Sequence, residues 1–393
     1  MILKRTMLIT FTLITVAMII TVVSGLFTYS KIARVDIKHT SKTTPKSNYT
    51  KAVPGSGVTS ILLATLGSRG LTVAQGKALG VPDVAHRGAD GLTDILMLAL
   101  VNRANGHVSL LSIPRDTWVE TCQCKINSLY NSQGAPALLD QVEQVTGIRP
   151  DHLVLINFSA FANLINSVGG VNIYVPNTIK DDYSHLPPTN AGCQVMNGTL
   201  ALEYVRSRHT QTLLNGGWVA DQSGTDFGRI NRQQEVISAL SRKLLSPSLP
   251  LHIPAILSTM GSGLTLDSSL SLVTATAIAG NLATAMTTSS ISGFSLPSTT
   301  RYINGQSAVL VVPSALVDIL NKWRAAVSLP PITALSQASP AAPSPRGSTV
   351  PAAPAATTPT TTTAPTSPPA GTPVYYPYGG ETKQGLGVNA PTC

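Results

Sequence analysis

Between residues 58 and 328, short apolar runs alternate with segments of helical periodicity, and this alternation restricts the possible folds more than any other feature of the chain. Short runs of aliphatic and β-branched residues between turn residues indicate buried strands, and longer segments with apolar residues three and four positions apart indicate helices. The predicted strands are 60–66, 93–101, 107–113 and 171–175, and the predicted helices are 135–145, 160–168, 229–245 and 314–323. This alternation predicts an α/β fold, with an α/β/α-type domain around a central sheet.

The dipeptide Asn105-Gly106 lies between the second and third predicted strands. Asn-Gly is strongly preferred in two-residue turns, because both residues tolerate the positive φ that a tight hairpin requires. A hairpin joins antiparallel strands, whereas strands connected through a crossover helix are parallel. The central sheet is therefore predicted to be mixed.

The N-terminus is not part of the domain. Met7–Phe27 contains 21 residues without a charge and follows Lys4 and Arg5. That length is sufficient for a helix to cross a bilayer. A cleaved signal peptide has a shorter apolar core, and Val23-Ser24-Gly25 matches its cleavage site only loosely. We therefore expect one transmembrane helix, a signal anchor over residues 7–27, after a short cytoplasmic N-terminus of residues 1–6.

The composition changes on both sides of the alternating region. Residues 28–57 are rich in Lys, Thr and Ser, which predicts an extracytoplasmic linker between the anchor and the folded domain of residues 58–328. Residues 329–393 consist largely of Pro, Ala, Thr and Ser and have too few apolar side chains to form a core. This last segment is predicted to be a disordered tail.

The chain has four cysteines, at positions 122, 124, 193 and 393. One residue separates Cys122 from Cys124, which is fewer than the two to four residues between ligands in the usual zinc sites. This small number of cysteines fits one or two disulfides in an oxidising compartment. We expect a bridge from Cys122 or Cys124 to Cys193, with free thiols as the alternative.

The formal net charge of +9 favours acidic partners, such as phosphorylated polymers or an anionic membrane surface. Nucleic acid would share this preference, but only 5% of the residues are aromatic, no base-stacking motif is present, and a membrane segment precedes the domain. We therefore expect no nucleic-acid partner. The sequence also lacks a G-x-S-x-G elbow, a complete P-loop and an H-E-x-x-H motif, which argues against the hydrolases, nucleotide-binding proteins and zinc peptidases that carry them.

Four arginines lie within fewer than thirty residues of a chain that is only 11% charged. If the chain around them is extended, Arg206 and Arg208 point to the same face of a strand. If a helix begins at Arg229, then Arg229, Arg232 and Gln233 share one of its faces, although Arg232 could also be a solvated helix residue. Planar guanidinium groups pair well with phosphate oxygens, so this cluster predicts a binding site for a diphosphate.

Three acidic residues and one further arginine are candidates for the same site. Arg115 and Asp116 follow a predicted strand, where sites of α/β folds commonly lie; the alternative is a turn with a surface ion pair. Asp94 borders an apolar strand and could hold magnesium together with substrate phosphates, or be an ordinary strand-end carboxylate in solvent. Asp226 could be the N-cap of the following helix, a role that does not exclude a second one beside a phosphate.

Six segments form an ordered set of motifs: Thr93–Leu98, Ser112–Asp116, Lys125–Asn127, Val168–Val171, Gly198–Arg208 and Asp226–Gln234. In these residues and in this order, the chain resembles the LytR-CpsA-Psr family of bacterial cell-wall glycopolymer transferases over roughly residues 58 to 325. Several independent motifs in one order are more specific than any one of them.

The resemblance implies an enzyme of the cell membrane, held by the single span of residues 7–27 with its C-terminal domain on the extracytoplasmic side. The implied donor is a glycan linked to a polyprenyl diphosphate, whose lipid lies in an apolar groove. The implied acceptor is a hydroxyl of peptidoglycan, and polyprenyl phosphate is released. The usual cofactor is Mg²⁺.

The resemblance also implies roles for individual residues. The diphosphate would be bound by Arg69, Arg115, Arg206, Arg208, Arg229, Arg232 and Gln233. The implied metal ligand is Asp94. The catalytic set would be Arg115, Asp116, Arg206, Arg208, Asp226 and Arg229, in which Asp116 and Asp226 are candidates for the base that accepts the proton of the acceptor hydroxyl.

The sequence departs from the family pattern at two positions. The family often has a G-x-D-x-R motif after its first strand, with the aspartate on the metal, and Gly67 stands at that position here. It also commonly has an arginine two residues before Asp94, where this chain has Leu92. Asp116 or another carboxylate could replace the missing ligand. The alternatives to a transferase are a polyprenyl phosphate-binding or wall-regulating protein without turnover, and a hydrolase of the same diphosphate.

Overall fold

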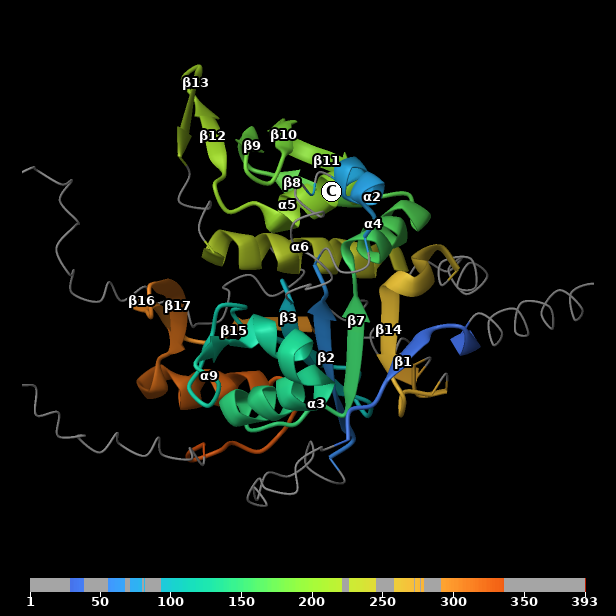
Figure 1. The fold of residues 1–393 in the computed structure, drawn as a ribbon, viewed down its shortest axis with the longest axis vertical. Helices are drawn as coiled ribbons and strands as arrows, with labels where there is room; N and C mark the ends of the chain where they lie inside the picture. Colours follow the sequence, from blue (N-terminus) through green and yellow to red (C-terminus); the bar gives the residue numbers. More distant parts are fainter. Residues whose placement is uncertain are drawn as a thin grey trace, which may run out of the picture.

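The computed structural model describes residues 29–38, 56–67, 71–79, 81, 93–220, 226–244, 258–271, 273–275, 277–278, 291–335 and 393. Its centre is a seven-stranded sheet (Figure 1). From one edge to the other, the strands are β1 (Ala33–Val35), β14 (Leu264–Asp267), β7 (His152–Ile156), β2 (Val58–Thr65), β3 (Leu96–Asn102), β4 (Val108–Ser112) and β15 (Ile291–Ser295).

The sheet is mixed. Three neighbouring pairs run parallel (β1 with β14, β7 with β2, β4 with β15), and the pairs β14–β7, β2–β3 and β3–β4 are antiparallel. In the turn between β3 and β4, Gly106 has a φ of 72° and its amide donates to the carbonyl of Asn102 at 2.9 Å. The predicted α/β fold with a central mixed sheet is confirmed, and so is the hairpin predicted at Asn105-Gly106.

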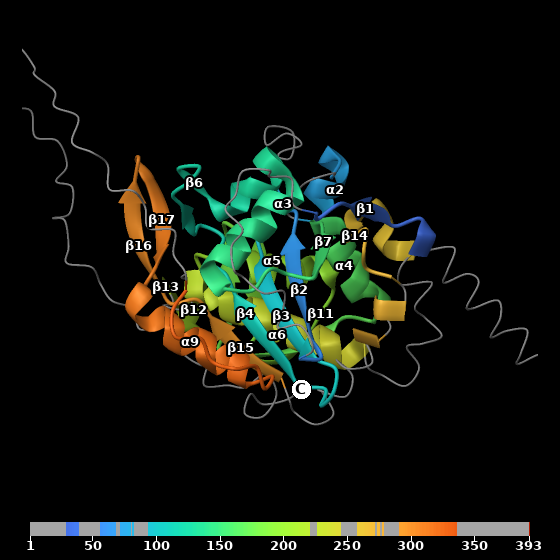
Figure 2. The ribbon, with the colours of Figure 1, turned by 90° about the horizontal axis from the view of Figure 1, so that it is seen from below.

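Helices cover both faces of this sheet (Figures 1 and 2). Leu62, Leu98 and other residues on one face pack with α3 and α9, whereas Ile61 and Met97 on the opposite face pack with α6. Neighbouring residues of a strand point to opposite faces, so strands that are apolar throughout are buried on both sides. The helices are α2 (Val73–Ala78), α3 (Ile126–Thr146), α4 (Phe158–Ser167), α5 (Gly198–Arg206), α6 (Asp226–Leu244) and α9 (Pro313–Ala325).

α3 is longer than the helix predicted over residues 135–145. It begins at Ile126 and is interrupted at Gly134, whose φ of 83° is not helical. Pro136 then occupies the first turn of the second part, where proline is tolerated because its missing amide hydrogen has no intrahelical acceptor. The apolar periodicity indicated only this second part, because Gly134 and Pro136 separate it from the first.

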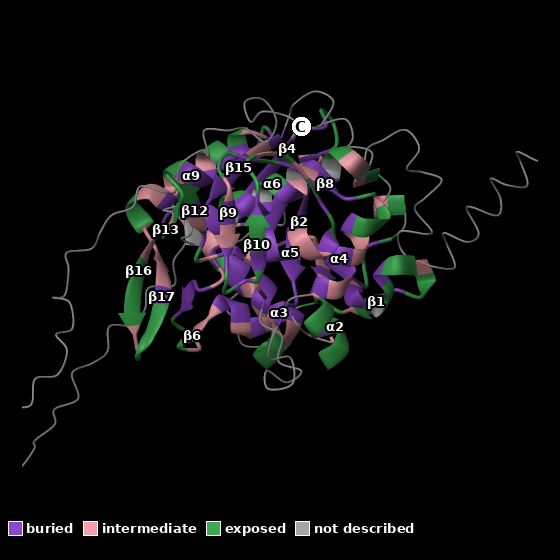
Figure 3. Ribbon diagram, turned by 90° about the horizontal axis from the view of Figure 1, so that it is seen from above, coloured by how far each residue is buried: buried purple, intermediate pink, exposed green. Residues whose placement is uncertain are grey.

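Smaller sheets surround the central one. A four-stranded sheet in the order β10-β9-β12-β13 lies beyond α5 and α6 (Figure 1), and Figure 3 shows part of the β16–β17 hairpin as exposed. The predicted strand at residues 171–175 forms as β8 but pairs with β11 instead of joining the central sheet. The bounds are β5 (Trp118–Val119), β6 (Cys124–Lys125), β8 (Val171–Val175), β9 (Ile179–Asp181), β10 (Leu186–Thr189), β11 (Gly192–Met196), β12 (Gln211–Leu214), β13 (Gly217–Ala220), β16 (Ser298–Ile303) and β17 (Gln306–Val311).

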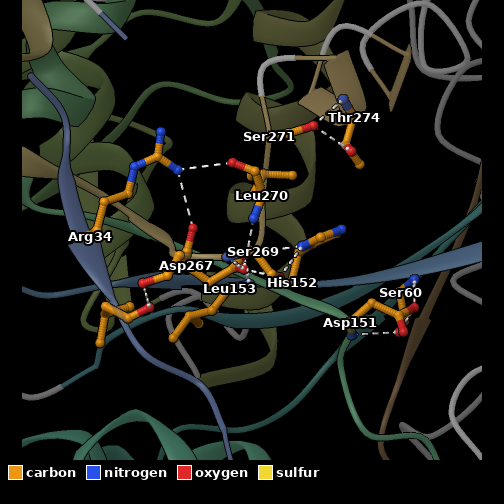
Figure 4. A network of polar contacts seen from close by, with 12 residues as sticks. Arg34, Ser60, Asp151, His152, Leu153, Asp267, Ser269, Leu270, Ser271 and Thr274 are labelled. Atoms are coloured by element: carbon orange, nitrogen blue, oxygen red, sulfur yellow. Dashed lines mark hydrogen bonds and ion pairs between the residues drawn. The ribbon is translucent and has the colours of Figure 1, made fainter. Parts of the chain in front are cut away.

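Part of the predicted linker is bound to the domain. Residues 33–35 form β1, the edge strand parallel to β14. Arg34 Nη1 donates to the carbonyls of Asp267 at 3.2 Å and Leu270 at 2.9 Å (Figure 4). The Tyr29 hydroxyl donates to the same Leu270 carbonyl at 2.6 Å. Residues 29–38 therefore belong to the domain, and the rest of the predicted linker, residues 28 and 39–55, lies outside the described residues.

The predicted transmembrane segment, residues 7–27, and residues 336–392 of the predicted tail also lie outside the described residues. Within the described part of the chain, no helix combines the length and the apolar character needed to span a bilayer. The first residues of the predicted tail pack on the domain: Leu329 is buried, and Ile332 and Leu335 contact the core of α3 and α9.

The cysteines pair differently from the prediction. Cys122 is bonded to Cys124, and Cys193 in β11 is bonded to the last residue, Cys393. The predicted bridge from Cys122 or Cys124 to Cys193 is therefore wrong. Gln123 has a φ of 51°, and the turn it forms brings the Cα atoms of its two neighbours within 5.2 Å, which is within the usual span of a disulfide. Four cysteines allow three connectivities, and the sequence cannot distinguish them.

α4 and α5 approach each other closely at Gly198, the first residue of α5. A Cβ atom at this position would lie 2.1 Å from the carbonyl oxygen of Ala162 and 2.7 Å from its Cα atom. Both are backbone atoms of α4, so no side-chain rotation relieves the clash. The contact fixes where α5 begins, and hence where its C-terminal end lies.

We expect Gly198→Ala to lower the free energy of unfolding by about 3 kcal/mol or more, because the added methyl group forces the two helices apart. Urea denaturation measures this change. Gly217→Ala is the matched control, because the nearest atom to its new Cβ is the Leu214 carbonyl oxygen at 3.8 Å. An unfolding free energy of Gly198→Ala equal to that of the control would contradict the close packing.

Candidate functional site

The candidate site lies at one edge of the central sheet. β2, β4 and β7 end at this edge and β3 begins there, because β3 is antiparallel to both β2 and β4 while β7 is parallel to β2. Gly67 follows β2 and Asp94 precedes β3, and the Asp94 amide donates to the carbonyl of Thr65, the last residue of β2, at 3.1 Å. Arg115 follows β4. The strand ends thus bring together residues that are far apart in the sequence.

Asp94, Arg115 and Asp116 form a cluster of ion pairs at this edge. The Arg115 guanidinium pairs with the Asp94 carboxylate through Nη1, and its Nε lies 3.5 Å from Asp116 Oδ2. Lys125 at the end of β6 adds a second cation, with Nζ 3.4 Å from Asp116 Oδ1. The Asp94 and Arg115 side chains are 25% and 21% exposed, so both remain accessible to a ligand.

Asn127 in the first turn of α3 holds this cluster together. Its side-chain amide donates to Asp116 Oδ1 at 3.4 Å, and its backbone amide donates to the carbonyl of Arg115 at 3.1 Å. Its carbonyl accepts from the Thr93 amide at 3.0 Å. Lys125 and Asn127 belong to the motif Lys125–Asn127, but their contacts with Asp116 and Arg115 could not be predicted from the sequence.

Arg206 approaches the same edge from α5. It is the last residue of this helix, so the extended conformation considered for residues 204–208 is wrong. The helix forms because Asn197 caps its N-terminus, with its side chain accepting from the Leu200 amide at 2.9 Å. The Arg206 guanidinium lies 5.3 Å from the centre of the Phe158 ring, and the Phe158 amide donates to the Gly67 carbonyl at 3.2 Å. Arg206 is thereby connected to the loop after β2.

Gly67 itself has a φ of 49°, in the left-handed region. Glycine adopts this conformation without strain, and aspartate and asparagine are among the few other residues that visit it routinely. The backbone at the position where the family often has an aspartate is therefore suited to either residue. Arg69 and Leu92, which also bear on the family pattern, lie outside the described residues.

A buried carboxylate, Asp181 at the end of β9, fixes the turn that carries Arg208. Asp181 Oδ2 accepts from the Ser207 hydroxyl at 2.6 Å and from the amides of Arg208 and His209 at 2.8 Å each. Its other oxygen accepts from the Tyr183 amide at 2.9 Å and the Ser184 amide at 3.2 Å. The conformation of the arginine-bearing turn therefore depends on one fully buried residue.

Burial by itself raises the pKa of Asp181, but the hydrogen bonds from Ser207, His209, Ser184 and Arg208 outweigh burial and hold the pKa below its ordinary value. Asp181 thus stays ionised at neutral pH. Sequence reasoning missed it, because it lies 25 residues before Arg206 in an Asp-Asp pair that resembles an ordinary polar turn.

α6 supports the end of α5. It begins at Asp226, three residues before the predicted start, and the side chain of Asp226 lies outside what the structure describes. Arg232 donates through Nε to the Tyr204 carbonyl at 3.2 Å and through Nη2 to the Ser207 carbonyl, and Gln233 donates to the Val205 carbonyl at 3.4 Å. Arg232 and Gln233 therefore donate to three backbone carbonyls at the end of α5, where helix carbonyls have few intrahelical donors.

The eight predicted site residues whose side chains the structure describes thus divide by their contacts. Arg115 and Asp116 lie with Asp94 at the strand ends, and Arg206 and Arg208 flank the end of α5. Arg229, in the first turn of α6, is buried, with 6% of its surface exposed. Arg232 and Gln233, by contrast, are engaged with the protein backbone.

Glu203 lies one turn before Arg206 on α5, and no role was predicted for it. The residue is buried, and burial raises the pKa of its carboxyl to about 7, although the charge of Arg206 lowers it. Positions three apart on a helix share a face, which explains this influence. Glu203 therefore changes its protonation near neutral pH beside an arginine of the candidate site.

The described residues do not build a complete metal site by themselves. No group of three His, Cys, Asp or Glu side chains in the described ranges is placed to hold an ion. Magnesium, however, is commonly bound by one or two carboxylates together with substrate phosphates. Asp94, partly exposed at the edge of the cluster, fits such a shared site.

These features define a class of protein: an α/β domain with a cluster of arginines and carboxylates at one edge of its central sheet. A model of the LytR_cpsA_psr family matches residues 26–325. The chain therefore belongs to the LytR_cpsA_psr family. This confirms the resemblance found in the sequence motifs.

Individual relatives agree with this assignment. The chain is 32% identical over 180 residues to the polyisoprenyl-teichoic acid–peptidoglycan teichoic acid transferase TagV of Bacillus subtilis, covering 43% of each protein. It is 31% identical over 243 residues to the probable cell wall biosynthesis protein LcpB of Corynebacterium glutamicum, covering 60% of this chain and 52% of the relative. The matches thus span about half the length of these curated relatives.

A solved structure of similar fold is the LytR-Csp2A-Psr enzyme from Actinomyces oris. It aligns with a TM-score of 0.55 over 75% of this chain and 96% of its own, at 23% sequence identity. At this identity the likeness supports the fold alone.

Asp181 offers a direct test of the site's architecture. We expect Asp181→Asn to lower the free energy of unfolding by about 2–4 kcal/mol, because neutral Asn cannot replace the carboxylate's hydrogen bonds to Ser207 and the turn amides. Asp182→Asn makes the same chemical change at the neighbouring carboxylate, whose side chain is 70% exposed. Equal stability of the two variants in urea denaturation would refute the anchoring role.

Glu203 gives a pH-dependent prediction. Its carboxyl titrates near 4.5 in the unfolded chain and near 7 in the folded protein, so between these values the folded protein retains a proton that the unfolded chain has lost. The stability contribution of Glu203 therefore falls as pH rises through this window. Glu203→Gln removes the effect, so we expect its unfolding free energy to exceed that of the wild type by about 1–3 kcal/mol near pH 8.

The same two proteins should have equal stability near pH 4, because Glu203 is then protonated in both states of the wild type. Glu120→Gln, at an exposed glutamate, is the control and should follow the wild type at both pH values. A Glu203→Gln variant no more stable than the wild type near pH 8 would show that Glu203 carries no buried charge.

Proposed function

We propose that this protein is an extracytoplasmic transferase that moves a glycopolymer from a polyprenyl diphosphate carrier onto peptidoglycan during cell-wall assembly. The observation that supports the proposal is that Arg115 follows the end of β4, while Arg206 ends α5 and Arg208 lies in the turn after it, in a member of this family. The relative TagV is named for the transfer of polyisoprenyl-linked teichoic acid to peptidoglycan, which supports the same reaction class.

The reaction we propose breaks the phosphoanhydride bond of the diphosphate and forms a new phosphate ester. The oxygen of a peptidoglycan hydroxyl attacks the phosphorus next to the glycan, and the bond from that phosphorus to the oxygen bridging the two phosphates breaks. Polyprenyl phosphate leaves with the bridging oxygen and its electron pair, and the glycan becomes joined to peptidoglycan through a phosphodiester. The hydroxyl proton passes to a base.

The arginines contribute electrostatically. Negative charge grows on the departing polyprenyl phosphate, and guanidinium groups fixed in place before the reaction stabilise that charge without reorganising. Asp181 fixes the turn of Arg208, and α6 fixes the end of α5 that carries Arg206. The protein thus supplies oriented cations where charge develops.

Magnesium belongs to the same proposal. Asp94 would hold the ion together with phosphate oxygens of the donor, and the ion would neutralise part of the phosphate charge. Arg115, which pairs with Asp94 here, would then be available to the diphosphate. Gly67 supplies no carboxylate, so the proposal gives Asp94 the main part in holding the ion.

For the base we retain Asp116 and Asp226. The Asp116 carboxylate lies beside two cations, with Oδ2 3.5 Å from Arg115 Nε and Oδ1 3.4 Å from Lys125 Nζ. An ionised carboxylate near the acceptor hydroxyl can accept its proton.

We further propose that residues 7–27 anchor the protein in the cell membrane as a single span, with the domain on the extracytoplasmic side. Two disulfides in the described chain support this location, because disulfides persist in oxidising compartments outside the cytosol. The fixed β1, which begins six residues after Phe27, would hold the domain near the membrane that contains the donor.

We expect Arg206→Ala and Arg208→Ala each to reduce transfer by about a hundredfold, because each removes a positioned charge from the growing phosphate anion. The assay follows label from a polyprenyl diphosphate-linked disaccharide into peptidoglycan. Arg301→Ala, at an exposed arginine of the β16–β17 hairpin, is the control and should retain wild-type activity. Transfer at the wild-type rate by both site variants would sink the assignment.

The same assay distinguishes a transferase from a hydrolase and from a carrier protein without turnover. These two alternatives arise because Gly67 provides no carboxylate for the metal, which could weaken turnover. A hydrolase would release glycan phosphate into solution without labelling peptidoglycan. A carrier or regulatory protein would bind the donor and form no product. Transfer requires labelled peptidoglycan together with polyprenyl phosphate.

A further inference from the structure

Two exposed aromatic rings lie beside the arginine-bearing turn. The rings of Tyr183 and His209 have their centroids 4.4 Å apart with an angle of 42° between their planes. Tyr183 is 77% exposed and His209 is also exposed, so neither ring is part of a core. An aromatic pair that is held together but left in solvent is characteristic of a surface that contacts a ligand.

The outward face of the adjoining sheet continues this surface. In the register of the sheet, Gln211 lies opposite Lys180 and Leu213 lies opposite Trp218. Directly opposed residues of antiparallel strands share a face, and so do residues two apart, so these four side chains point the same way. Lys180 Nζ lies 5.2 Å from the Trp218 ring, and Leu213 is 38% exposed.

This surface is continuous with the candidate site. Tyr183 follows β9 and His209 precedes β12, and because these strands are antiparallel the two residues lie at the same end of the sheet. Asp181 binds the amides of Tyr183, Arg208 and His209 together. The aromatic pair is therefore fixed to the same carboxylate as the arginine that the proposed function places on the diphosphate.

We propose that Tyr183 and His209, with Trp218 and Lys180 beyond them, form a platform that binds the sugar rings of the acceptor, the glycan strand of peptidoglycan. Pyranose rings present apolar C–H faces that pack on aromatic rings, while their hydroxyls remain in water or bind polar groups such as Lys180. This inference rests on the proposed function and adds to it the surface that holds the acceptor.

The position of the platform favours the acceptor over the donor. β1, the described strand nearest in sequence to the expected membrane anchor, lies across the molecule from the β12–β13 hairpin (Figures 1 and 2). A donor embedded in the membrane would reach the arginines from the side of the anchor. The opposite side is open to a polymer outside the membrane, and the platform lies there.

The test uses the full chain and purified peptidoglycan sacculi stripped of attached polymer, and measures the protein that sediments with them. We expect Tyr183→Ala to bind about five- to tenfold more weakly than the wild type, the loss expected for one aromatic contact. Trp218→Ala should weaken binding in the same direction. Tyr183→Phe should bind as the wild type does, because it keeps the ring.

Tyr302→Ala is the matched control, because Tyr302 is 78% exposed but lies on the separate β16–β17 hairpin. If Tyr183→Ala sediments with sacculi as the wild type does, or if Tyr302→Ala loses as much binding as Tyr183→Ala, the proposed platform is wrong. So would a Tyr183→Ala variant that loses affinity for a polyprenyl diphosphate-linked disaccharide but not for sacculi, since the rings would then hold the donor. Failure of the proposed function is distinguishable, because the wild type itself would then transfer nothing.

Discussion

The arginine end of the site depends on one buried carboxylate. Arg206 and Arg208 are separated by one residue at the end of α5. Asp181 accepts hydrogen bonds from the Ser207 hydroxyl and from the two backbone amides that follow it, which holds the turn in place. Preorganised cations of this kind stabilise developing charge more effectively than mobile ones.

A second layer of support lies behind the turn. Arg232 and Gln233 of α6 bind the carbonyls of Tyr204, Val205 and Ser207, and the Tyr204 hydroxyl binds Glu235 at 2.8 Å. Arg232 and Gln233, two polar side chains of the motif Asp226–Gln234, therefore bind the protein's own backbone. Their role is to hold the helix that presents Arg206.

The opposite part of the site is built on ion pairs. Arg115 contacts Asp94 and Asp116, and Lys125 contacts Asp116, so two cations and two anions balance at the strand ends. An incoming diphosphate would compete with Asp94 for Arg115, and Asp94 would instead hold magnesium, which would neutralise part of the phosphate charge. The charge balance of the cluster thus fits a site completed by its substrate.

Three neighbouring strands of the central sheet were predictable from the sequence because their signals are local, whereas β1, β7, β14 and β15 were not predicted. The apolar runs gave β2, β3 and β4, and Asn105-Gly106 gave their hairpin. The conformation of Arg206 and the partners of Arg232 and Gln233 were not predictable, because they depend on contacts between α5 and α6. Asp181 and Glu203 were missed for the same reason: a carboxylate becomes important through the groups that surround it in the fold. The disulfide prediction was wrong because Cys193 and Cys393 are 200 residues apart, and their proximity in the fold cannot be inferred from the sequence.

The most direct measurement is a structure of the protein with a bound short-chain polyprenyl diphosphate disaccharide. We expect the diphosphate oxygens to contact Arg206 and Arg208, with Arg115 turned toward them and the hydrogen bonds of Asp181 unchanged. A diphosphate bound away from these arginines, or a turn at Arg208 that rearranges to reach it, would contradict the idea that the fold prepares this site in advance.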